Sequence, residues 1–240
     1  MISIITPTYN PGGSIVDTYE SIAAQEDAAY EFLVIDGGSK DSSVHQFVKW
    51  RESNSKFRFI SERDHGLYDA MNKGVRFASG DYVLFLGAGD RLKEKNILSR
   101  IERGIVSSHP DILYGYVVFC YPNGKKEEYK KRINWLYPIR SFPISHQAVI
   151  AKRKLLLDYP FDLSFKIAAD QDWIMKMYKM GKRFHYMDVP ITDYDMTGIS
   201  ASEEGRHLGF VERCDIHKKY YPAFFKFYHA LRTIKGTAGR

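Results

Sequence analysis

Four short apolar segments in the first ninety residues constrain the fold of this chain more than any other feature. Each has four or five residues and ends at a cluster of small polar or acidic residues. Because they are apolar along their whole length and separated by helix-length segments, they are typical of parallel strands buried on both faces. The four predicted strands are residues 2–5, 32–35, 57–60 and 82–86.

The segments between these strands carry apolar residues at helical spacing, which predicts helices at residues 14–25, 41–50 and 67–78. The second of them begins at an Asp-Ser-Ser sequence suited to a helix N-cap. Strands and helices therefore alternate over the first 86 residues. This alternation predicts an α/β fold with a doubly wound, mostly parallel central sheet flanked by helices.

The second half of the chain is less regular. Its predicted elements are helices at 94–106 and within 164–180, a hairpin of 112–119 with 125–131, and a strand at 183–189. Neither an internal repeat nor a low-complexity linker interrupts it. We therefore predict one compact domain over residues 1–212, followed by a basic extension at 213–240.

The composition is that of an ordinary globular protein, with 44% hydrophobic and 27% charged residues. No apolar stretch approaches the roughly 18 residues of a membrane span. The chain enters its first strand at once, so we expect no secretory signal. Cys120 and Cys214 are far apart and have no metal-like spacing, so we expect two reduced, buried thiols in a cytosolic protein.

Three acidic residues, Asp36, Asp64 and Asp90, follow the second, third and fourth predicted strands. In open α/β sheets a ligand lies beyond the carboxyl ends of the strands, so we expect the chemistry at this rim. The chain has neither a GxGxxG fingerprint nor a GxxxxGK[ST] loop. A nucleotide bound here would have to be held by its base, its ribose and a metal ion.

The residues around these carboxylates allow more than one interpretation. The glycines beside Asp36 would let a base or ribose approach closely. Arg63 and Lys73 could neutralise phosphates, although a solvated helix face explains Lys73 as well. Asp90, with phosphate oxygens and waters, could hold Mg²⁺ or Mn²⁺.

Six segments of the chain form a recognisable ordered set. They are SIITPTYN (3–10), VIDGGSKD (34–41), DHGLYDAMNKG (64–74), ASGDY (78–82), LGAGD (86–90) and AADQD (168–172). Taken in order, they resemble family 2 glycosyltransferases, which have the GT-A type nucleotide-diphospho-sugar transferase fold. The resemblance covers roughly residues 1 to 200, and the chain looks most similar to the small enzymes that build bacterial exopolysaccharides, capsules or O-antigens.

The resemblance implies a role for each matching residue. Thr6, Pro7 and Tyr9 would line the nucleoside pocket, although loop packing explains Pro7 and Tyr9 equally well. Asp36 would bind the base, and Asp64 would also meet the nucleoside. Lys73, from the same segment as Asp64, is our further candidate for donor binding.

The family's acidic metal motif falls on 87–90, where only Asp90 keeps a carboxylate. Asp90 is therefore the expected ligand of Mg²⁺ or Mn²⁺. A segment at 197–200 resembles a family loop that closes over the donor phosphates. His207, just beyond that loop, is a second candidate ligand for the metal or the pyrophosphate.

Asp170 matches the family's catalytic acid. An acceptor hydroxyl is a poor nucleophile near neutral pH, so a carboxylate must take its proton during attack on the anomeric carbon. The resemblance implies a single displacement that inverts the anomeric configuration. A helix cap is the alternative role for Asp170, and Asp172 is the alternative base. His146 resembles the acceptor side of the family's pocket, but a lone histidine beside apolar residues is more often structural.

The net charge of +6 belongs mainly to the tail, because no acidic residue follows Asp215. Nucleic-acid-binding proteins more often spread basic residues over a recognition face, so we expect no nucleic-acid partner. Residues 222–235 predict a basic, aromatic-rich amphipathic helix. This helix could bind an anionic membrane or pack on the domain, and both remain open. We therefore expect a cytoplasmic protein, with attachment to the inner face of the cell membrane as a further possibility.

The leading hypothesis is a metal-dependent glycosyltransferase that moves a sugar from a nucleotide-diphospho-sugar to a glycan or lipid-linked acceptor. A sugar nucleotidyltransferase on a similar sheet is one alternative, but residues 7–13 lack the basic residues that would hold a triphosphate. A non-catalytic relative that binds nucleotide or glycan is the other, because the acidic metal motif is reduced.

Overall fold

One mixed sheet organises the protein. The computed structural model describes residues 1–134, 144–198 and 202–222. Within these residues the sheet has nine strands in the order β3-β2-β1-β4-β8-β6-β9-β5, and β7 pairs with β6. The strands are β1 (Ile2–Thr8), β2 (Tyr30–Asp36), β3 (Phe57–Ser61), β4 (Tyr82–Phe85), β5 (Arg91–Leu92), β6 (Ile112–Cys120), β7 (Lys126–Tyr129), β8 (Val149–Lys152) and β9 (Phe184–Asp195).

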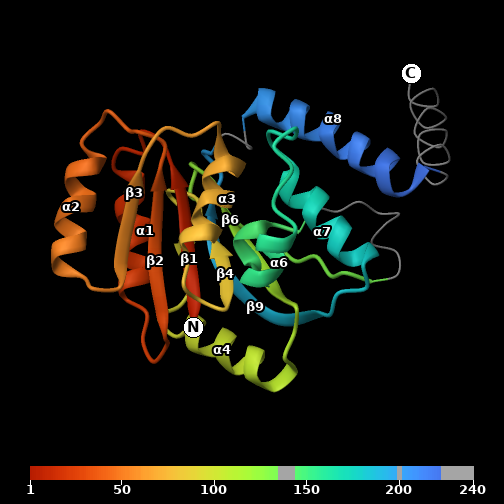
Figure 1. Ribbon diagram of the computed structural model, residues 1–240, viewed down its shortest axis with the longest axis horizontal. Coiled ribbons are helices and arrows are strands. Elements are labelled where there is room, and N and C mark those ends of the chain that lie inside the picture. The colour runs from red at the N-terminus through yellow and green to blue at the C-terminus, as the bar shows by residue number, and fades with distance from the viewer. Residues whose placement is uncertain (135–143, 199–201, 223–240) are drawn as a thin grey trace.

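Helices cover both faces of the sheet, and α7 and α8 lie together at one end of the molecule (Figure 1). Residues of α1, α2 and α4 form one buried cluster with the sheet, and residues of α3, α6 and α7 form the other. The helices are α1 (Ser14–Ala23), α2 (Ser43–Ser53), α3 (Leu67–Phe77), α4 (Ile97–Ser108), α6 (Arg153–Asp158), α7 (Ala169–Lys179) and α8 (Glu203–Tyr220), with a short 3₁₀ turn at His146–Ala148.

The parallel strands β1, β2 and β4 are buried on both faces, whereas β3, at the edge of the sheet, is only partly buried. Every residue of β1 and β2 is buried. Side chains alternate along a strand, so Ile4 packs into one cluster and its neighbour Ile5 into the other. This arrangement confirms the predicted mostly parallel α/β architecture of the first half.

The second half follows the predictions in part. The hairpin is confirmed as β6 and β7. The strand predicted at 183–189 is wrong in length, because β9 continues to Asp195 alongside β6, with irregular register near Tyr116. The elements β8 and α6 were not predicted. The predicted boundary at 212 falls inside α8, and residues 223–240, which include most of the predicted tail helix, lie outside the described residues.

Cys120 and Cys214 are free thiols, as predicted, but both are only partly buried, so the expected burial was wrong. Among the helices of the described residues, none is both long and apolar enough to cross a membrane.

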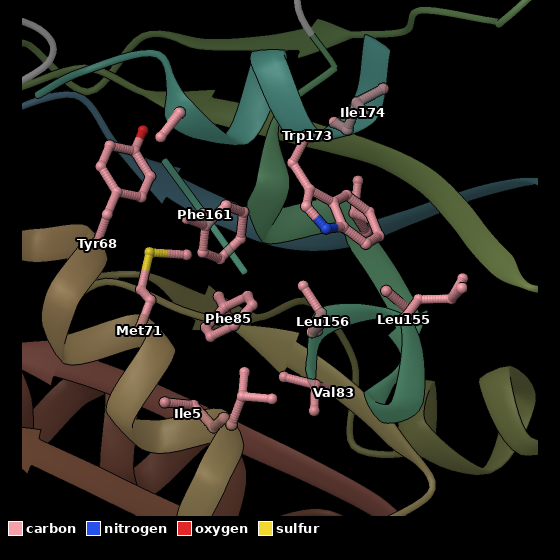
Figure 2. Close-up of a cluster of buried hydrophobic side chains, with 14 of the residues drawn as sticks. Ile5, Tyr68, Met71, Val83, Phe85, Leu155, Leu156, Phe161, Trp173 and Ile174 are labelled. Carbon is pink, nitrogen blue, oxygen red and sulfur yellow. The ribbon is translucent and has the colours of Figure 1, made fainter. Parts of the chain in front are cut away.

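A cluster of aromatic rings joins α3, β4, α7 and the loop before α7 (Figure 2). Phe161 lies at its centre, with ring centroids 5.5 Å from Tyr68, 5.6 Å from Phe85 and 6.2 Å from Trp173. Asn72 holds this residue in place, because its amide donates to the Phe161 carbonyl (3.0 Å) and accepts from the Phe161 N–H (2.9 Å). The cluster therefore links the parallel half of the sheet to the start of α7.

Replacing Phe161 with alanine should lower the free energy of unfolding by about 3–5 kcal/mol, because the buried ring would leave a cavity between three others. Urea denaturation of the purified variant measures this loss. Phe77→Ala is the matched control, since Phe77 is 44% exposed, and it should change the free energy by about 0.5 kcal/mol or less. Equal losses in the two variants would contradict this assignment of the core.

Candidate active site

The carboxyl ends of the parallel strands meet at one rim of the sheet. Strands β1, β2, β3 and β4 run in the same direction, and two successive antiparallel pairings return β6 to that direction. Asp36 ends β2, and Asp64 and Asp90 follow β3 and β4 closely. The rim therefore carries the three carboxylates predicted there.

Asp36 organises the loop that follows β2. Its carboxylate is fully buried and accepts hydrogen bonds from the Ser61 hydroxyl (2.6 Å), the Ser39 N–H (3.0 Å) and the Gly38 N–H (3.2 Å). The Ser39 hydroxyl also donates to it. Because protein donors occupy both oxygens, this side chain shapes the loop, and its contact with a base stays a prediction.

Asp64 lies directly over the glycine that follows Asp36. A Cβ atom added to Gly37 would lie only 2.6 Å from Asp64 Oδ2, so the close approach requires glycine. The other oxygen, Oδ1, accepts from the Gly66 N–H at 2.9 Å. Asp36 and Asp64 thus form the first pair of carboxylates on the rim, between the ends of β2 and β3.

The residues predicted for the nucleoside pocket differ in their exposure to solvent. The Tyr9 side chain is 61% exposed at the end of β1, where its ring is free to stack. Pro7 and Thr6 are buried, and the Thr6 hydroxyl has no hydrogen-bond partner among the described residues.

Lys73 is used within the protein. Its ammonium lies 3.1 Å from Glu62 and 3.8 Å from Asp69, and it donates to the Arg63 carbonyl at 2.8 Å. Only 13% of the side chain is exposed. Lys73 therefore holds the loop between β3 and α3. Its contact with the donor stays a prediction.

Asp90 is the buried carboxylate of the turn after β4. It accepts from the Gly87 N–H (2.8 Å) and the Asp195 N–H (3.0 Å) and is only 3% exposed. Burial raises the pKa of its carboxyl to about 6. Gly89 has a φ of +102°, and a Cβ there would lie 2.7 Å from Asp195 Oδ2, so the glycines let this turn close against β9.

Asp170 lies at the start of α7 among three partners. His146 Nδ1 is 2.9 Å from its Oδ2, and the Gln171 N–H donates to its Oδ1 at 2.9 Å. The Tyr68 hydroxyl lies 3.0 Å from the same Oδ1 and 2.7 Å from the Ile167 carbonyl, so its single proton is shared between these two acceptors. Burial, and after it the Asp170 charge, raise the pKa of Tyr68 well above its usual value, so its hydroxyl remains a donor. Asp172, the alternative base, instead forms an ion pair with Lys219 at 2.8 Å.

His146 lies beside Asp170 and near the end of β4. It begins the short turn (His146–Ala148) that leads into β8. Because β8 runs antiparallel to β4, with Ile150 opposite Leu84, this turn lies beside the carboxyl end of β4, where the turn that holds Asp90 begins. Tyr68, in the first turn of α3, contacts the same Asp170 carboxylate, and α3 follows the loop that holds Asp64.

Sequence reasoning gave Tyr68 no role and interpreted His146 as structural. The position of Tyr68 in the first turn after Asp64 was the available signal. For His146 the only signal was its resemblance to a family segment.

The described residues hold no group of side chains that would bind a metal ion by itself. No three His, Cys, Asp or Glu side chains of residues 1–134, 144–198 and 202–222 are grouped as metal ligands. His207, on α8, is exposed and belongs to no such group. Backbone N–H groups bind both oxygens of Asp90, so its role as the one protein ligand of an ion that also takes phosphate oxygens and water stays a prediction.

Comparisons with solved structures agree with this architecture. Staphylococcus aureus TarS (residues 1–349, with UDP-GlcNAc) superposes with a TM-score of 0.70 at 21% identity, covering 94% of this chain and 73% of TarS. The mannosyltransferase PcManGT of Pyrobaculum calidifontis, solved with GDP-Man and Mn²⁺, gives 0.70 at 18% identity, covering 100% and 76%. These likenesses show the GT-A fold.

Sequence comparisons identify relatives and the family. A PGL/p-HBAD biosynthesis glycosyltransferase of Mycobacterium bovis (strain BCG / Pasteur 1173P2) is 32% identical over 203 residues, covering 82% of this chain and 78% of the relative. The amylovoran biosynthesis glycosyltransferase AmsB of Erwinia amylovora is 26% identical over 224 residues, covering 87% and 74%. The profile of glycosyl transferase family 2 matches residues 3–166. The chain therefore belongs to glycosyl transferase family 2 and is a glycosyltransferase with the GT-A fold.

Proposed function

We propose that this enzyme transfers a sugar, with inversion, from a nucleoside-diphosphate sugar to a hydroxyl of a glycan or lipid-linked acceptor. The observation that carries the proposal is Asp170, held by His146 and Tyr68 at the start of α7, near the carboxyl end of β4. The relatives named for PGL/p-HBAD and amylovoran biosynthesis support a role in making bacterial surface polysaccharide or glycolipid.

The nucleoside end of the donor would bind at the first pair of carboxylates. Tyr9 offers an exposed ring for stacking on the base. Asp64, half-buried above Gly37, offers a carboxylate to base or ribose donors. The TarS and PcManGT complexes, with UDP-GlcNAc and GDP-Man, support a sugar nucleotide as the class of donor.

The diphosphate would lie beside Asp90. A bound Mg²⁺ or Mn²⁺ would offset the negative charge that develops on the leaving diphosphate. Asp90 would hold such an ion from the protein side.

Asp170 would accept the proton of the acceptor hydroxyl. As the oxygen forms its bond to the anomeric carbon, the bond from that carbon to the diphosphate oxygen breaks, and its electron pair leaves with the nucleoside diphosphate. Tyr68 and His146 hold the carboxylate in place, so it faces the acceptor in a fixed orientation.

Asp170→Asn should lower the rate of transfer by about 10²–10⁴-fold, because the amide cannot accept the proton. The affinity for the nucleoside diphosphate should stay within about twofold, because the base-binding residues are untouched. Mass spectrometry of reactions with a panel of sugar nucleotides and lipid-linked acceptors measures transfer, and calorimetry measures binding. Asp215→Asn, on the exposed side of α8, is the control, and unchanged turnover in Asp170→Asn would remove Asp170 from the mechanism.

Mn²⁺ alone should raise the melting temperature little, whereas UDP or GDP together with Mn²⁺ should raise it more than either component alone. The reason is that the described residues contribute few ligands of their own. Asp90→Asn should remove most of the extra increase. Strong stabilisation by Mn²⁺ without nucleotide would contradict a donor-held ion.

The same titration separates the alternative functions. A nucleotidyltransferase should respond to nucleoside triphosphates, and a non-catalytic relative should bind diphosphate but give no product with any donor in the panel.

The cellular location remains part of the proposal. We expect a cytoplasmic enzyme that reaches lipid-linked acceptors at the inner face of the membrane, helped by the basic tail. That tail lies mostly in residues 223–240, outside the described part of the chain.

A further inference from the structure

We propose that Glu212, on α8, is a positioning residue for Asp170: its carboxylate fixes the backbone at which α7 begins and so sets where the base lies. This inference rests on the proposed function of Asp170. It deepens that function by naming the element that holds the base in place.

Glu212 is buried and fully engaged with one stretch of backbone. Its Oε1 accepts from the Lys166 N–H at 2.6 Å, and its Oε2 accepts from the N–H groups of Ile167 (2.9 Å) and Ala168 (2.8 Å). The residue is only 7% exposed. Three consecutive N–H groups thus converge on a single carboxylate, and hydrogen bonds to an ionised acceptor are stronger than neutral ones.

Glu212 orders the backbone that leads into α7. The N-cap residue of this helix is Ala168, which has no side-chain oxygen and makes no side-chain capping bond. Glu212, 44 residues further along the chain, binds the N–H groups of Ala168 and of the two residues before it. These buried N–H groups are thereby paired, and the negative charge of Glu212 is favourable near the helix start.

The same backbone is bound directly to the Asp170 site. Within the peptide group that joins Ile167 to Ala168, the Ala168 N–H donates to Glu212, while the Ile167 carbonyl accepts from the Tyr68 hydroxyl at 2.7 Å. That hydroxyl is also 3.0 Å from Asp170 Oδ1. Weakening the bond to Glu212 would therefore move a peptide group whose hydrogen-bond partner, Tyr68, also contacts Asp170.

Helix α8 packs closely against α7 and the residues just before it. A Cβ at Gly209 would lie 3.0 Å from Ile167 Cγ2, so the helix packs closely against the Ile167 side chain. Ile216 is buried in the same core cluster as α7, and Lys219 pairs with Asp172. These contacts fall on one face of α8, which leaves Glu212 little freedom to move.

Glu212→Gln is the sharpest test, because it keeps the size of the side chain but replaces one acceptor oxygen with a group that cannot accept. We expect kcat to fall by about 10–100-fold, as a misplacement of about 1 Å can cost that much. The KM for the donor should stay within about twofold. UDP-GlcNAc and GDP-Man are the first donors to assay, and Glu204→Gln, in the exposed first turn of α8, is the matched control.

A readout independent of substrate accompanies the kinetics. In Glu212→Gln, peptides covering 164–172 should exchange their amide hydrogens faster, whereas peptides covering β1 and β2 should not change. Glu212→Asp keeps the charge on a shorter side chain and should give a smaller change of the same kind. It also serves as the test if the glutamine variant does not fold.

A double-mutant cycle separates this inference from the proposed function. If Glu212 acts through Asp170, Glu212→Gln should cost almost nothing further in the Asp170→Asn background. Three results would overturn the positioning role. The first is that the losses in kcat of the two variants add fully, and the second is that the donor KM rises as much as kcat falls. The third is an unchanged kcat in a Glu212→Gln protein that is destabilised. Full activity of the Asp170→Asn variant would instead show that Asp170 is not the base. Faster amide exchange in Glu212→Gln would then report a structural contact alone.

Discussion

The pairing of β1 between β2 and β4 is the constraint on which the site depends. β1 pairs with β2 in parallel from Ile2 opposite Tyr30 to Thr8 opposite Asp36, so the two strands end level with each other. A parallel partner requires a crossover, and each crossover here is a helix that covers a face of the sheet. Loops that are distant in sequence therefore emerge at the same edge, where their polar residues can act on one ligand.

Burial makes the Asp90 carboxyl costly to ionise in the folded protein. The raised pKa of Asp90 means that the folded protein holds this proton more tightly than the unfolded chain does. The stability contributed by protonated Asp90 is therefore complete below about pH 4 and is lost as the pH rises through about 6. At neutral pH the buried, ionised carboxylate weakens the fold, and a nearby cation would offset part of that cost.

Local pattern made the first half of the fold predictable, because each buried strand and its covering helix lie within about 30 residues of sequence. The positions of Asp36, Asp64 and Asp90 followed from strand ends alone. The surroundings of Asp170 did not, because Tyr68 is 102 residues away and His146 is 24 away, and no periodic signal links them. Likewise β8 enters antiparallel between β4 and β6, a choice that long-range pairing decides.

The boundary drawn at residue 212 shows why composition is a poor guide to the limit of a catalytic unit. It was drawn because basic residues accumulate toward the end of the chain, yet the helix that crosses it carries Ile216 in the core and Lys219 on Asp172. A charge near the end of the chain can still pair with the folded domain, as the exposed Lys219 ammonium does with the buried carboxylate of Asp172. Helix α8 therefore belongs with the sheet and α7 as far as the described residues extend, and the unit that presents Asp170 includes at least residues 203–220.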